Sequence, residues 1–492
     1  MQPEQELINE RLKKLEDIKK LGINPYPYTF EKTHDTIAIL DRFKKLKKEE
    51  KTKNKVSVAG RIVSLRRMGK ASFAHLQDAS GKIQFYIKED DIGSTQYELF
   101  KKFDIGDIVG IHGTVFRTKM GEITIHCTQM TLLTKSIRPL PEKWHGLKDV
   151  EARYRNRHLD LISNPETKII FIKRAQIVSS MRAFLDTKGF LEVETPVLQK
   201  IYGGANARPF KSFLHDLKMD VYLRISDELY LKRLIVGGFE KVYEISKDFR
   251  NESIDRTHNP EFTLMEAYAA YWDYEDVMKL TEQMVAFIAK QVNGTTKCVF
   301  KGKTINLQPP WQRLSMIDAI KKYAKINVTK LSDAEIQATL RNYNIEYEGD
   351  YTRGIAIQLL FEELCEDKLV GPVFIIDHPK ETTMLCKTKR GNPQLIERFE
   401  PYVAGMEIGN AYSELNDPLL QRQLLEEQAR QLRAGSEEAH PMDEEFVQTL
   451  EVGMPPTGGV GISVDRITMI LTGQESIRDV VFFPFMKDTS PK

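Results

Sequence analysis

The segment from Val56 to Leu133 contains five short strand-like runs and no long helical pattern, and it constrains the fold more than any other stretch. The runs are VSVAGRIVSL, KASFAHLQ, KIQFYIKE, GDIVGIHGTVF and EITIHCTQMTLL, separated by turns that contain glycine. Short strands joined by tight turns are typical of a small barrel or a sandwich. The charged run at residues 45–56 before them is predicted to be a solvated linker.

The remainder of the chain mixes helix and strand patterns. Residues 4–21 predict an amphipathic helix, and two prolines at residues 138–146 predict a linker. A long helix is predicted next, because Asn164 can cap it, Pro165 suits its first position and Gly189 can end it. The strand-like runs that follow include LEVETPVL, KVYEIS, FTLMEAY, VFIID, EIGNAYSEL and GVGISV. Strands close in sequence favour antiparallel pairing, as in an α+β domain.

Composition restricts the function only weakly. The length suggests about two to four domains. A net charge of +2 neither requires nor excludes a nucleic-acid partner. The four cysteines lack the spacing of a metal site, which favours a reducing compartment. The charged N-terminus has no secretory pattern, and no apolar run reaches about 18 residues, so we expect a cytosolic protein without a membrane span.

The stretch KDFRNESIDRTHNPEFTLMEAY places charge on one side of two strand-like runs. Arg250 and Glu252 are two residues apart, as are Glu266 and Tyr268, so each pair shares one face of an extended strand. Phe262 shares the face of the second pair. Carboxylates, an arginine and a phenol suit a ligand that bears both anionic and cationic groups. A surface ion pair is the alternative interpretation of the Arg-x-Glu pattern.

Glycines interrupt the strand-like run GGVGISVDR at residues 458–466. Glycine weakens a strand unless something must approach its backbone closely. Asp465 can cap the helix that follows, which places Arg466 in the first turn. A glycine-rich strand leading to such an arginine fits a nucleotide, although neither GxGxxG before a helix nor a Walker A loop is present. A tightly packed strand is the alternative.

Acidic residues recur in FEPYVAGMEIGNAYSEL. Glu400 and Glu407 could share Mg²⁺, which binds to few carboxylates together with phosphate oxygens. Asn410 and Glu414 have the same strand parity, whereas Glu407 has the opposite one. All three can face one ligand only if the strand bulges near Gly409. An exposed acidic hairpin is the alternative.

One face of the predicted barrel carries groups suited to nucleic acid. Phe73, His75 and Gln77 share a strand face, Gln84 lies on the next strand, and Arg66 lies close by. Aromatic stacking beside basic residues suits the bases of single-stranded RNA. A position for Phe73 in the barrel core is the alternative.

Together these motifs resemble those of the class II aminoacyl-tRNA synthetases, and within that class the lysyl-tRNA synthetase family. The matching runs span nearly the whole chain and include GRIVSLRRMGKASFAHLQDASGKIQ, RPLPEKWHGLKDVEARYRNRHLDLI, GGANARPF, LRISDELYLKRLIVGGFEKVYEISKDFRNE, HNPEFTLMEAY, MEIGNAYSELND and GVGISVDR. The resemblance implies an α+β protein: an N-terminal OB-fold β-barrel, then a class II catalytic domain built on an antiparallel β-sheet flanked by helices. The implied parts are an N-terminal helix and charged linker at 1–54, an OB-fold anticodon-binding domain at 55–137, a linker at 138–163 and the catalytic domain at 164–492.

The resemblance also implies residue roles. The implied ATP-binding residues are Arg250, Glu252, His258, Asn259, Phe262, Glu407 and Arg466, with Arg250 and Arg466 catalytic. The implied lysine-binding residues are Gly204, Glu228, Arg250, Glu266, Tyr268, Asn410 and Glu414. The implied Mg²⁺ ligands are Glu400 and Glu407. The implied anticodon-binding residues are Arg66, Phe73, Gln84 and Glu122.

The implied reaction activates L-lysine with ATP to lysyl-adenylate and pyrophosphate, and then transfers lysine to the 3′ end of tRNA(Lys). A cytoplasmic homodimer is expected, with its interface built by the helix from residue 165 and the strand that ends at Pro196. Three positions depart from the family's usual residues: Ser253 and Ser463 stand where glycine is frequent, and Met384 stands where proline is common. None of these removes a charged group that the chemistry needs.

Two other functions stay open. An aspartyl- or asparaginyl-type class II synthetase is the nearer alternative, and Glu414 and Tyr268 argue against it. A non-catalytic RNA-binding protein on a synthetase scaffold is the other. The retained set of Arg250, Glu252 and Arg466 argues against it, because a protein that only binds RNA does not need them.

Overall fold

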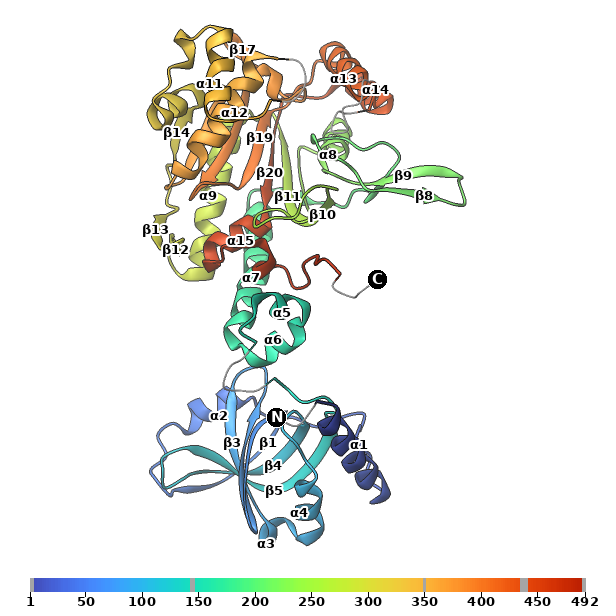
Figure 1. The fold of residues 1–492 in the computed structure, drawn as a ribbon, viewed down its shortest axis with the longest axis vertical. Coiled ribbons are helices and arrows are strands. Elements are labelled where there is room, and N and C mark those ends of the chain that lie inside the picture. Colours follow the sequence, from blue (N-terminus) through green and yellow to red (C-terminus); the bar gives the residue numbers. More distant parts are fainter. Residues whose placement is uncertain (1–3, 142–146, 348–350, 434–440, 489–492) are drawn as a thin grey trace. The chain divides into compact units, whose positions relative to one another are not determined.

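The computed structural model describes residues 4–141, 147–347, 351–433 and 441–488, and the chain divides into two compact units, residues 1–146 and 147–492 (Figure 1). Residues 142–146 of the predicted linker lie outside the described residues. In the described part of the chain, every helix is too short or too polar to cross a membrane.

The first unit is a closed five-stranded barrel in the order β1-β2-β3-β5-β4. Its strands are β1 Lys51–Met68, β2 Ala71–Gln77, β3 Lys82–Lys88, β4 Ile108–Arg117 and β5 Ile123–Thr134. Residues alternate between core and surface along β2 and β3, so Leu76 and Phe85 are buried inside the barrel while Phe73 is on its outer face. The expected barrel is therefore confirmed, and Phe73 is not a core residue.

The charged run before the barrel is only partly a linker. β1 begins at Lys51, and Lys55 pairs with Thr114 of β4. The prediction of a linker to residue 56 was therefore wrong at its C-terminal end, because Lys51, Lys53 and Lys55 alternate along the strand and all point to water. The helices of this unit are α1 Glu4–Lys20, α2 Thr36–Phe43, α3 Glu89–Ile92 and α4 Ser94–Lys101.

The second unit is built on a mixed sheet in the order β14-β15-β17-β19-β20-β11-β10-β6. Neighbouring strands from β15 to β10 are antiparallel, as expected, but the two edge pairs β14–β15 and β6–β10 are parallel. The strands of this unit are β6 Leu191–Glu192, β7 Leu198–Gln199, β8 Lys211–Leu214, β9 Met219–Leu223, β10 Lys241–Phe249, β11 Glu261–Ala270, β12 Lys297–Phe300, β13 Lys303–Asn306, β14 Gln312–Ser315, β15 Val373–Pro379, β16 Thr388–Lys389, β17 Asn392–Val403, β18 Met406–Glu407, β19 Gly409–Ser413 and β20 Thr457–Ser463.

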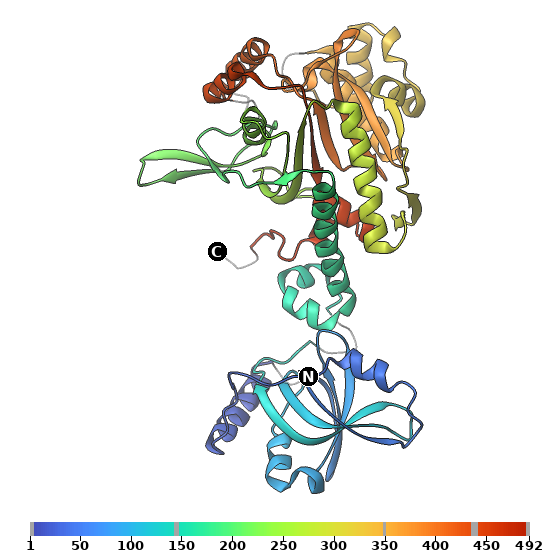
Figure 2. The same ribbon diagram turned by 180° about the vertical axis from the view of Figure 1, so that it is seen from behind.

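Helices pack on both faces of this sheet. The helices are α5 Val150–Arg155, α6 Arg157–Ser163, α7 Pro165–Thr187, α8 Glu228–Val236, α9 Tyr274–Asn293, α10 Met316–Ala319, α11 Asp333–Asn342, α12 Arg353–Cys365, α13 Pro418–Arg433, α14 Glu444–Gly453, α15 Val464–Thr472 and α16 Ile477–Val480. In Figure 2, α9 crosses in front of the sheet. Met265 and Ala267 of β11, Ile462 of β20 and Ile288 of α9 belong to one hydrophobic core, which lies between α9 and the sheet. The alternate residues of β11 therefore face the opposite side.

Several local predictions need correction. LEVETPVL forms two short strands in different sheets, β6 and β7, rather than one. Asn164 occupies the N-cap position of α7, but its side chain donates to Asp160 instead of capping the helix. Residues 150–163 of the predicted linker form α5 and α6, which bury an ion pair between Arg157 and Asp160. The domain boundaries themselves stay a prediction.

Candidate functional site

A cavity of about 430 Å³ opens on the face of the sheet opposite α9. Phe262, Leu264, Glu266 and Tyr268 of β11 line it, which confirms that they share one strand face. The structure brings together here every residue predicted for ATP, lysine or Mg²⁺: Gly204, Glu228, Arg250, Glu252, His258, Asn259, Phe262, Glu266, Tyr268, Glu400, Glu407, Asn410, Glu414 and Arg466. Their individual roles remain predictions.

Arg250 lies just beyond the end of β10, so the prediction that Arg250 and Glu252 both sit within a strand was wrong. The Arg250 N–H still donates to Pro260 O at 2.9 Å, which extends the ladder by one bond. The Arg250 guanidinium lies 5.1 Å from the centre of the Phe262 ring. Glu252 is exposed in the loop that follows. The result is a cation stacked on a half-buried aromatic ring at the cavity wall.

A chain of polar contacts links the loop after β10 to α15. Asp255 bonds to His258 Nδ1 at 2.7 Å, and His258 Nε2 lies 3.1 Å from an Arg466 nitrogen. Arg466 in turn donates to the Glu407 backbone oxygen at 2.7 Å and pairs with Glu407 Oε2 at 3.0 Å. Burial raises the pKa of Asp255, but hydrogen bonds from His258 and the Thr257 N–H outweigh it and lower the pKa to about 2. This loop and the helix-start arginine therefore share one charged network.

Ser463, and not Asp465, caps α15. The Ser463 hydroxyl accepts from the Arg466 N–H at 3.2 Å. Asp465 instead accepts from the Thr263 N–H of β11 at 2.7 Å and pairs with Arg174 of α7 at 2.6 Å. The predicted cap was wrong because Asp465 faces the sheet, whereas the residue that departs from the family pattern supplies the cap.

The predicted bulge near Gly409 is confirmed. β17 pairs Tyr402 with Glu407 but Phe399 with Ala411. Two residues lie between Phe399 and Tyr402 on β17, whereas three lie between Glu407 and Ala411. The β18–β19 side therefore carries one extra residue. The bulge turns Glu407 to the same cavity as Asn410 and Glu414, despite their opposite parity in the sequence.

The carboxylate of Glu400 is held by its own neighbours. Arg398 donates to Glu400 Oε1 at 2.5 Å, and the Tyr402 hydroxyl donates to Oε2 at 3.1 Å. Arg398 also donates to Asn410 Oδ1 at 3.0 Å. Glu400 and Glu407 are thus two oxygen donors on one wall of the cavity, a set that fits Mg²⁺ when phosphate oxygens supply the remaining ligands.

Glu266 is fixed by a ring of donors. Its Oε1 accepts from Ser226 Oγ at 2.8 Å, and its Oε2 accepts from the Tyr268 hydroxyl at 3.1 Å. Burial, together with the charges of Asp248 and Glu228, raises the pKa of Glu266 to about 8. This carboxyl therefore retains a proton below about pH 8, and a cation that enters the cavity would favour its ionised form.

Gly204 brings backbone against this group of side chains. Its φ is +89°, and a Cβ there would lie 2.8 Å from Ser226 Oγ and 3.1 Å from Glu228 Cβ. A side chain at residue 204 would therefore be strained and would fill the space in front of Glu228.

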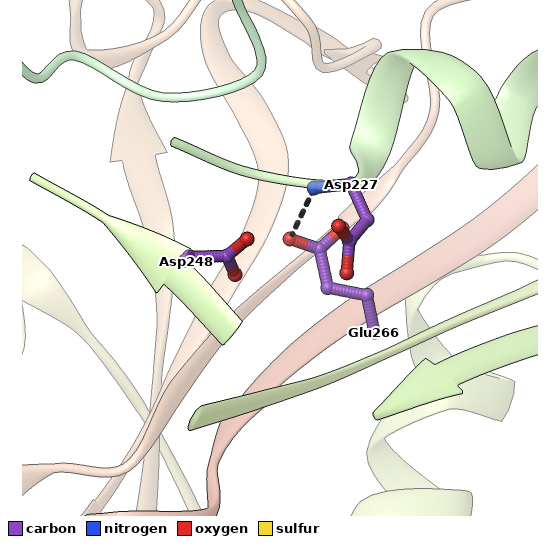
Figure 3. Close-up of side chains that lie close together, drawn as sticks. All are labelled: Asp227, Asp248 and Glu266. Carbon is purple, nitrogen blue, oxygen red and sulfur yellow. Dashed lines mark hydrogen bonds between the residues drawn. The ribbon is translucent and has the colours of Figure 1, made fainter. Parts of the chain in front are cut away.

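Three buried carboxylates, Asp227, Asp248 and Glu266, lie within 4.8 Å of one another (Figure 3). The Asp227 N–H donates to Glu266 Oε1 at 3.3 Å. Arg224 lies 3.0 Å from Asp227 Oδ1 and 3.3 Å from Asp248 Oδ1. Burial raises the pKa of Asp227 to about 8 and that of Asp248 well above its usual value. Arg224 therefore supplies a cation to two of these three carboxylates, and the Asp227 N–H holds the third.

Glu414 ends the cavity. Its Oε2 pairs with Lys232 Nζ at 2.5 Å, while its Oε1 is buried without a hydrogen-bond partner among the described residues. A Cβ at Gly459 would lie 2.1 Å from that Oε1 and 2.4 Å from the Tyr268 ring. Burial raises the pKa of Glu414 to about 8, against the lowering effect of Lys232. The glycine-rich strand is therefore required to make room for these two side chains.

The barrel places its predicted residues on one outer face. Glu122 accepts from Gln84 Nε2 at 2.7 Å, and Arg66 pairs with Phe73 across β1 and β2. The Phe73 ring lies 4.9 Å from that of Tyr86. This face thus combines the aromatic surface of Phe73 with the Gln84 amide and the exposed Arg66 guanidinium. Such a combination suits single-stranded bases.

Some site residues were missed from the sequence. Arg398 shares strand parity with Glu400, and Tyr412 lies between Asn410 and Glu414 with the same parity, so alternation could have identified both. Lys232 follows Glu228 by four residues, but α8 was not predicted as a helix, so their shared face was not seen.

Known proteins resemble the chain over nearly its full length. A family described as "tRNA synthetases class II (D, K and N)" matches residues 149–487, and an "OB-fold nucleic acid binding domain" family matches residues 56–133. The chain is 51% identical to the lysine–tRNA ligase of Moorella thermoacetica, with 99% of each chain covered. It is 52% identical to that of Clostridium botulinum, covering 98% of this chain and 96% of the relative, and 50% identical to that of Clostridium novyi, covering 98% and 95%.

Proposed function

Because this chain belongs to the class II tRNA synthetases of the D, K and N type, we propose that the cavity activates L-lysine with ATP and that the chain is a lysine–tRNA ligase. Lysine is the proposed amino acid because three buried carboxylates line this cavity: Glu228, Glu266 and Glu414. Lysine has two ammonium groups and one carboxylate. Charge-assisted hydrogen bonds to such groups are strong, and a buried acceptor left empty is costly.

The positions of these side chains suggest the orientation of the bound lysine. Glu228, beside Gly204, would accept the α-ammonium group. Glu414 and Tyr268, at the end of the cavity, would accept the ε-ammonium group. Arg250 and Asn410 would hold the carboxylate, the one anionic group of the substrate.

Activation needs no protein nucleophile. An oxygen of the lysine carboxylate forms a bond to the α-phosphorus of ATP, and the bond to the pyrophosphate oxygen breaks. Arg250, stacked on Phe262, would neutralise the α-phosphate, and Arg466 would hold the far end of ATP, so positioning and charge neutralisation lower the barrier. A terminal ribose hydroxyl of the tRNA then attacks the lysyl carbonyl, and AMP leaves.

Mg²⁺ is part of the proposal. Glu400 and Glu407 would hold it, and when bound it would neutralise phosphate charge. ATP has to displace Glu407 from Arg466 before both can serve the nucleotide, since they are now paired at 3.0 Å.

The barrel would read the anticodon of tRNA(Lys) with Arg66, Phe73, Gln84 and Glu122. Exposed Arg66 supplies charge for the phosphates, and the ring of Phe73 supplies a stacking surface. Gln84 and Glu122 offer hydrogen-bonding groups for base edges.

We also propose a homodimer. Three apolar side chains on and after α7 are more than half exposed: Ile169 at 54%, Ile172 at 57% and Leu198 at 54%. Such a surface rarely faces water in a stable protein. Sedimentation of the purified chain gives its mass directly. The cytoplasmic location expected from the sequence stays a prediction.

The aspartate- or asparagine-specific alternative is disfavoured by charge. A substrate with an anionic or neutral side chain would meet Glu414, whose Oε1 is buried and finds no hydrogen-bond donor in the described part of the chain. The non-catalytic alternative would not need Arg250, Arg466 and the two acidic residues of the β17–β18 wall on one cavity.

Lysine-dependent exchange of pyrophosphate into ATP, followed by charging of tRNA(Lys), tests the proposal. We expect both activities with lysine. Exchange with aspartate or asparagine instead would support the nearer alternative, and the absence of exchange with any amino acid would leave only RNA binding.

A further inference from the structure

Lys232 of α8 is a fully buried lysine that the reaction as described does not use. Its Nζ lies 2.5 Å from Glu228 Oε1 and 2.5 Å from Glu414 Oε2. Both carboxylates line the cavity, whereas Lys232 lies behind them. A lysine on one helix thus joins two carboxylates that both line the proposed amino-acid site.

Both acids depend on this cation for their positions. Glu228 is in the first turn of α8 and reaches Lys232 one turn later, and Glu414 follows the end of β19. A buried ammonium without partners is very unfavourable, so the three groups hold one another. Burial lowers the pKa of Lys232, but the two carboxylates outweigh it and raise the pKa, which keeps the ammonium charged.

When both carboxyls are ionised, the charges of this cluster do not balance. Two carboxylates share one ammonium, and among the described residues Oε1 of Glu414 is buried with neither an ion pair nor a hydrogen bond. The vacant oxygen lies beside Tyr268, where the space left by Gly459 ends. The cluster therefore lacks one cation, at one defined oxygen.

We propose that Lys232 is a positioning residue that determines specificity for lysine: it occupies one side of Glu228 and Glu414 and directs their remaining oxygens toward the two ammonium groups of the substrate. The inference rests on the proposed function. With Lys232 in place, the two carboxylates carry one uncompensated negative charge. A substrate with a terminal cation neutralises that charge, and a neutral or anionic side chain does not.

A purely structural ion pair is the competing explanation. Such a pair contributes to folding, and its loss destabilises the unit without singling out one substrate. The two explanations differ in the Michaelis constants, because a positioning role raises the KM for lysine and leaves the KM for ATP unchanged.

The decisive variant is Lys232→Met, which keeps most of the side-chain length and removes the charge. In lysine-dependent pyrophosphate exchange we expect the KM for lysine to rise about 100-fold, as for loss of one member of a buried charge pair. The KM for ATP should stay within about threefold. Lys135→Met is the matched control, because Lys135 is also fully buried, with Asp104 and Asp107 at 2.6 and 2.9 Å, but lies in the barrel unit. Its KM for lysine should not change.

Chemical rescue separates charge from shape. Lys232→Ala removes three carbons and the ammonium group, so n-propylammonium should lower the KM for lysine of this variant, and n-propanol should not. Lys232→Arg, which keeps the charge, should show a smaller rise in KM than Lys232→Met.

Each outcome decides the matter. A lysine KM of Lys232→Met within about threefold of wild type overturns the inference, and so does an equal rise in the KM for ATP. If Lys232→Met does not fold, Lys232→Gln, which keeps a hydrogen-bond donor but carries no charge, takes its place, and the same two results overturn the inference. Absence of lysine-dependent exchange in the wild type would instead refute the proposed function.

Discussion

Gly459 of β20 lies directly opposite Tyr268 of β11, and a Cβ at Gly459 would lie 2.4 Å from the Tyr268 ring. The same Cβ would lie 2.1 Å from Glu414 Oε1. One missing methyl group therefore makes the space in which the phenol and the carboxylate can both face the cavity.

Gly459→Ala should abolish lysine activation while leaving a folded protein. The added methyl group would displace Tyr268 or Glu414, so we expect the KM for lysine to rise by about 100-fold or more. Pyrophosphate exchange measures this. Gly371→Ala is the control, because a Cβ there meets nothing within 4 Å. A normal lysine KM in Gly459→Ala would show that this space is not used by the substrate.

Glu414→Gln should weaken lysine binding about 100-fold, because the amide cannot provide the charge for the ε-ammonium group. Titration calorimetry of lysine with the variant measures the dissociation constant. Glu363→Gln, an exposed residue on α12, is the control. Unchanged lysine affinity in Glu414→Gln would remove Glu414 from the side-chain pocket.

Lysine affinity should rise with pH. The pKa values of Glu266 and Glu414 are both raised to about 8, so below that pH each carboxyl retains a proton that an incoming ammonium has to displace. Between about pH 6 and 8 we expect the affinity to increase by up to about tenfold per pH unit for each proton released. Calorimetry in buffers of different ionisation heat counts the protons. A pH-independent affinity, or proton uptake, would contradict this.

Loss of the α15 cap should destabilise the catalytic unit slightly. Ser463→Ala should lower the free energy of unfolding by about 1 kcal/mol, and Ser463→Gly by only a few tenths. Denaturant unfolding of both variants gives the comparison. Equal stability of the alanine variant and wild type would mean that the hydroxyl contributes no cap. Ser463→Gly should keep the KM for ATP, since glycine is frequent at this position in the family.

The barrel residues should affect tRNA and not the adenylate. Phe73→Ala and Glu122→Gln should raise the KM for tRNA(Lys) in charging and leave pyrophosphate exchange unchanged, because neither residue lines the cavity. Loss of base stacking alone is worth about 1–3 kcal/mol. Tyr28→Ala, a fully exposed aromatic residue of the same unit, is the control. Equal charging by Phe73→Ala and Tyr28→Ala would reject this surface.

Alternation along strands explains why much of the site could be predicted. Phe262, Glu266 and Tyr268 follow a period of two, and the structure keeps that period on β11. The bulge near Gly409 could be inferred because Glu407 had the wrong parity for a residue that shares a ligand with Asn410. In both cases the direction of a side chain depends on its position within its own strand, so it could be predicted from the sequence.

Contacts between distant segments were beyond sequence reasoning. Asp465 looked like a cap because it precedes Arg466, but Thr263 and Arg174 from other elements bind it instead. Lys232 was not singled out in the sequence, and only the fold places Glu414 beside it. Arg250 lies outside β10 because the ladder with β11 ends at Phe249.

The most direct test of the account is a crystal structure of the protein with a non-hydrolysable lysyl-adenylate analogue. The account predicts the ε-ammonium group within hydrogen-bond distance of Glu414 Oε1 and the Tyr268 hydroxyl, with the adenosine against Phe262 and the phosphate at Arg250. An analogue whose ammonium group lies away from Glu414, or whose adenosine lies outside this cavity, would contradict it.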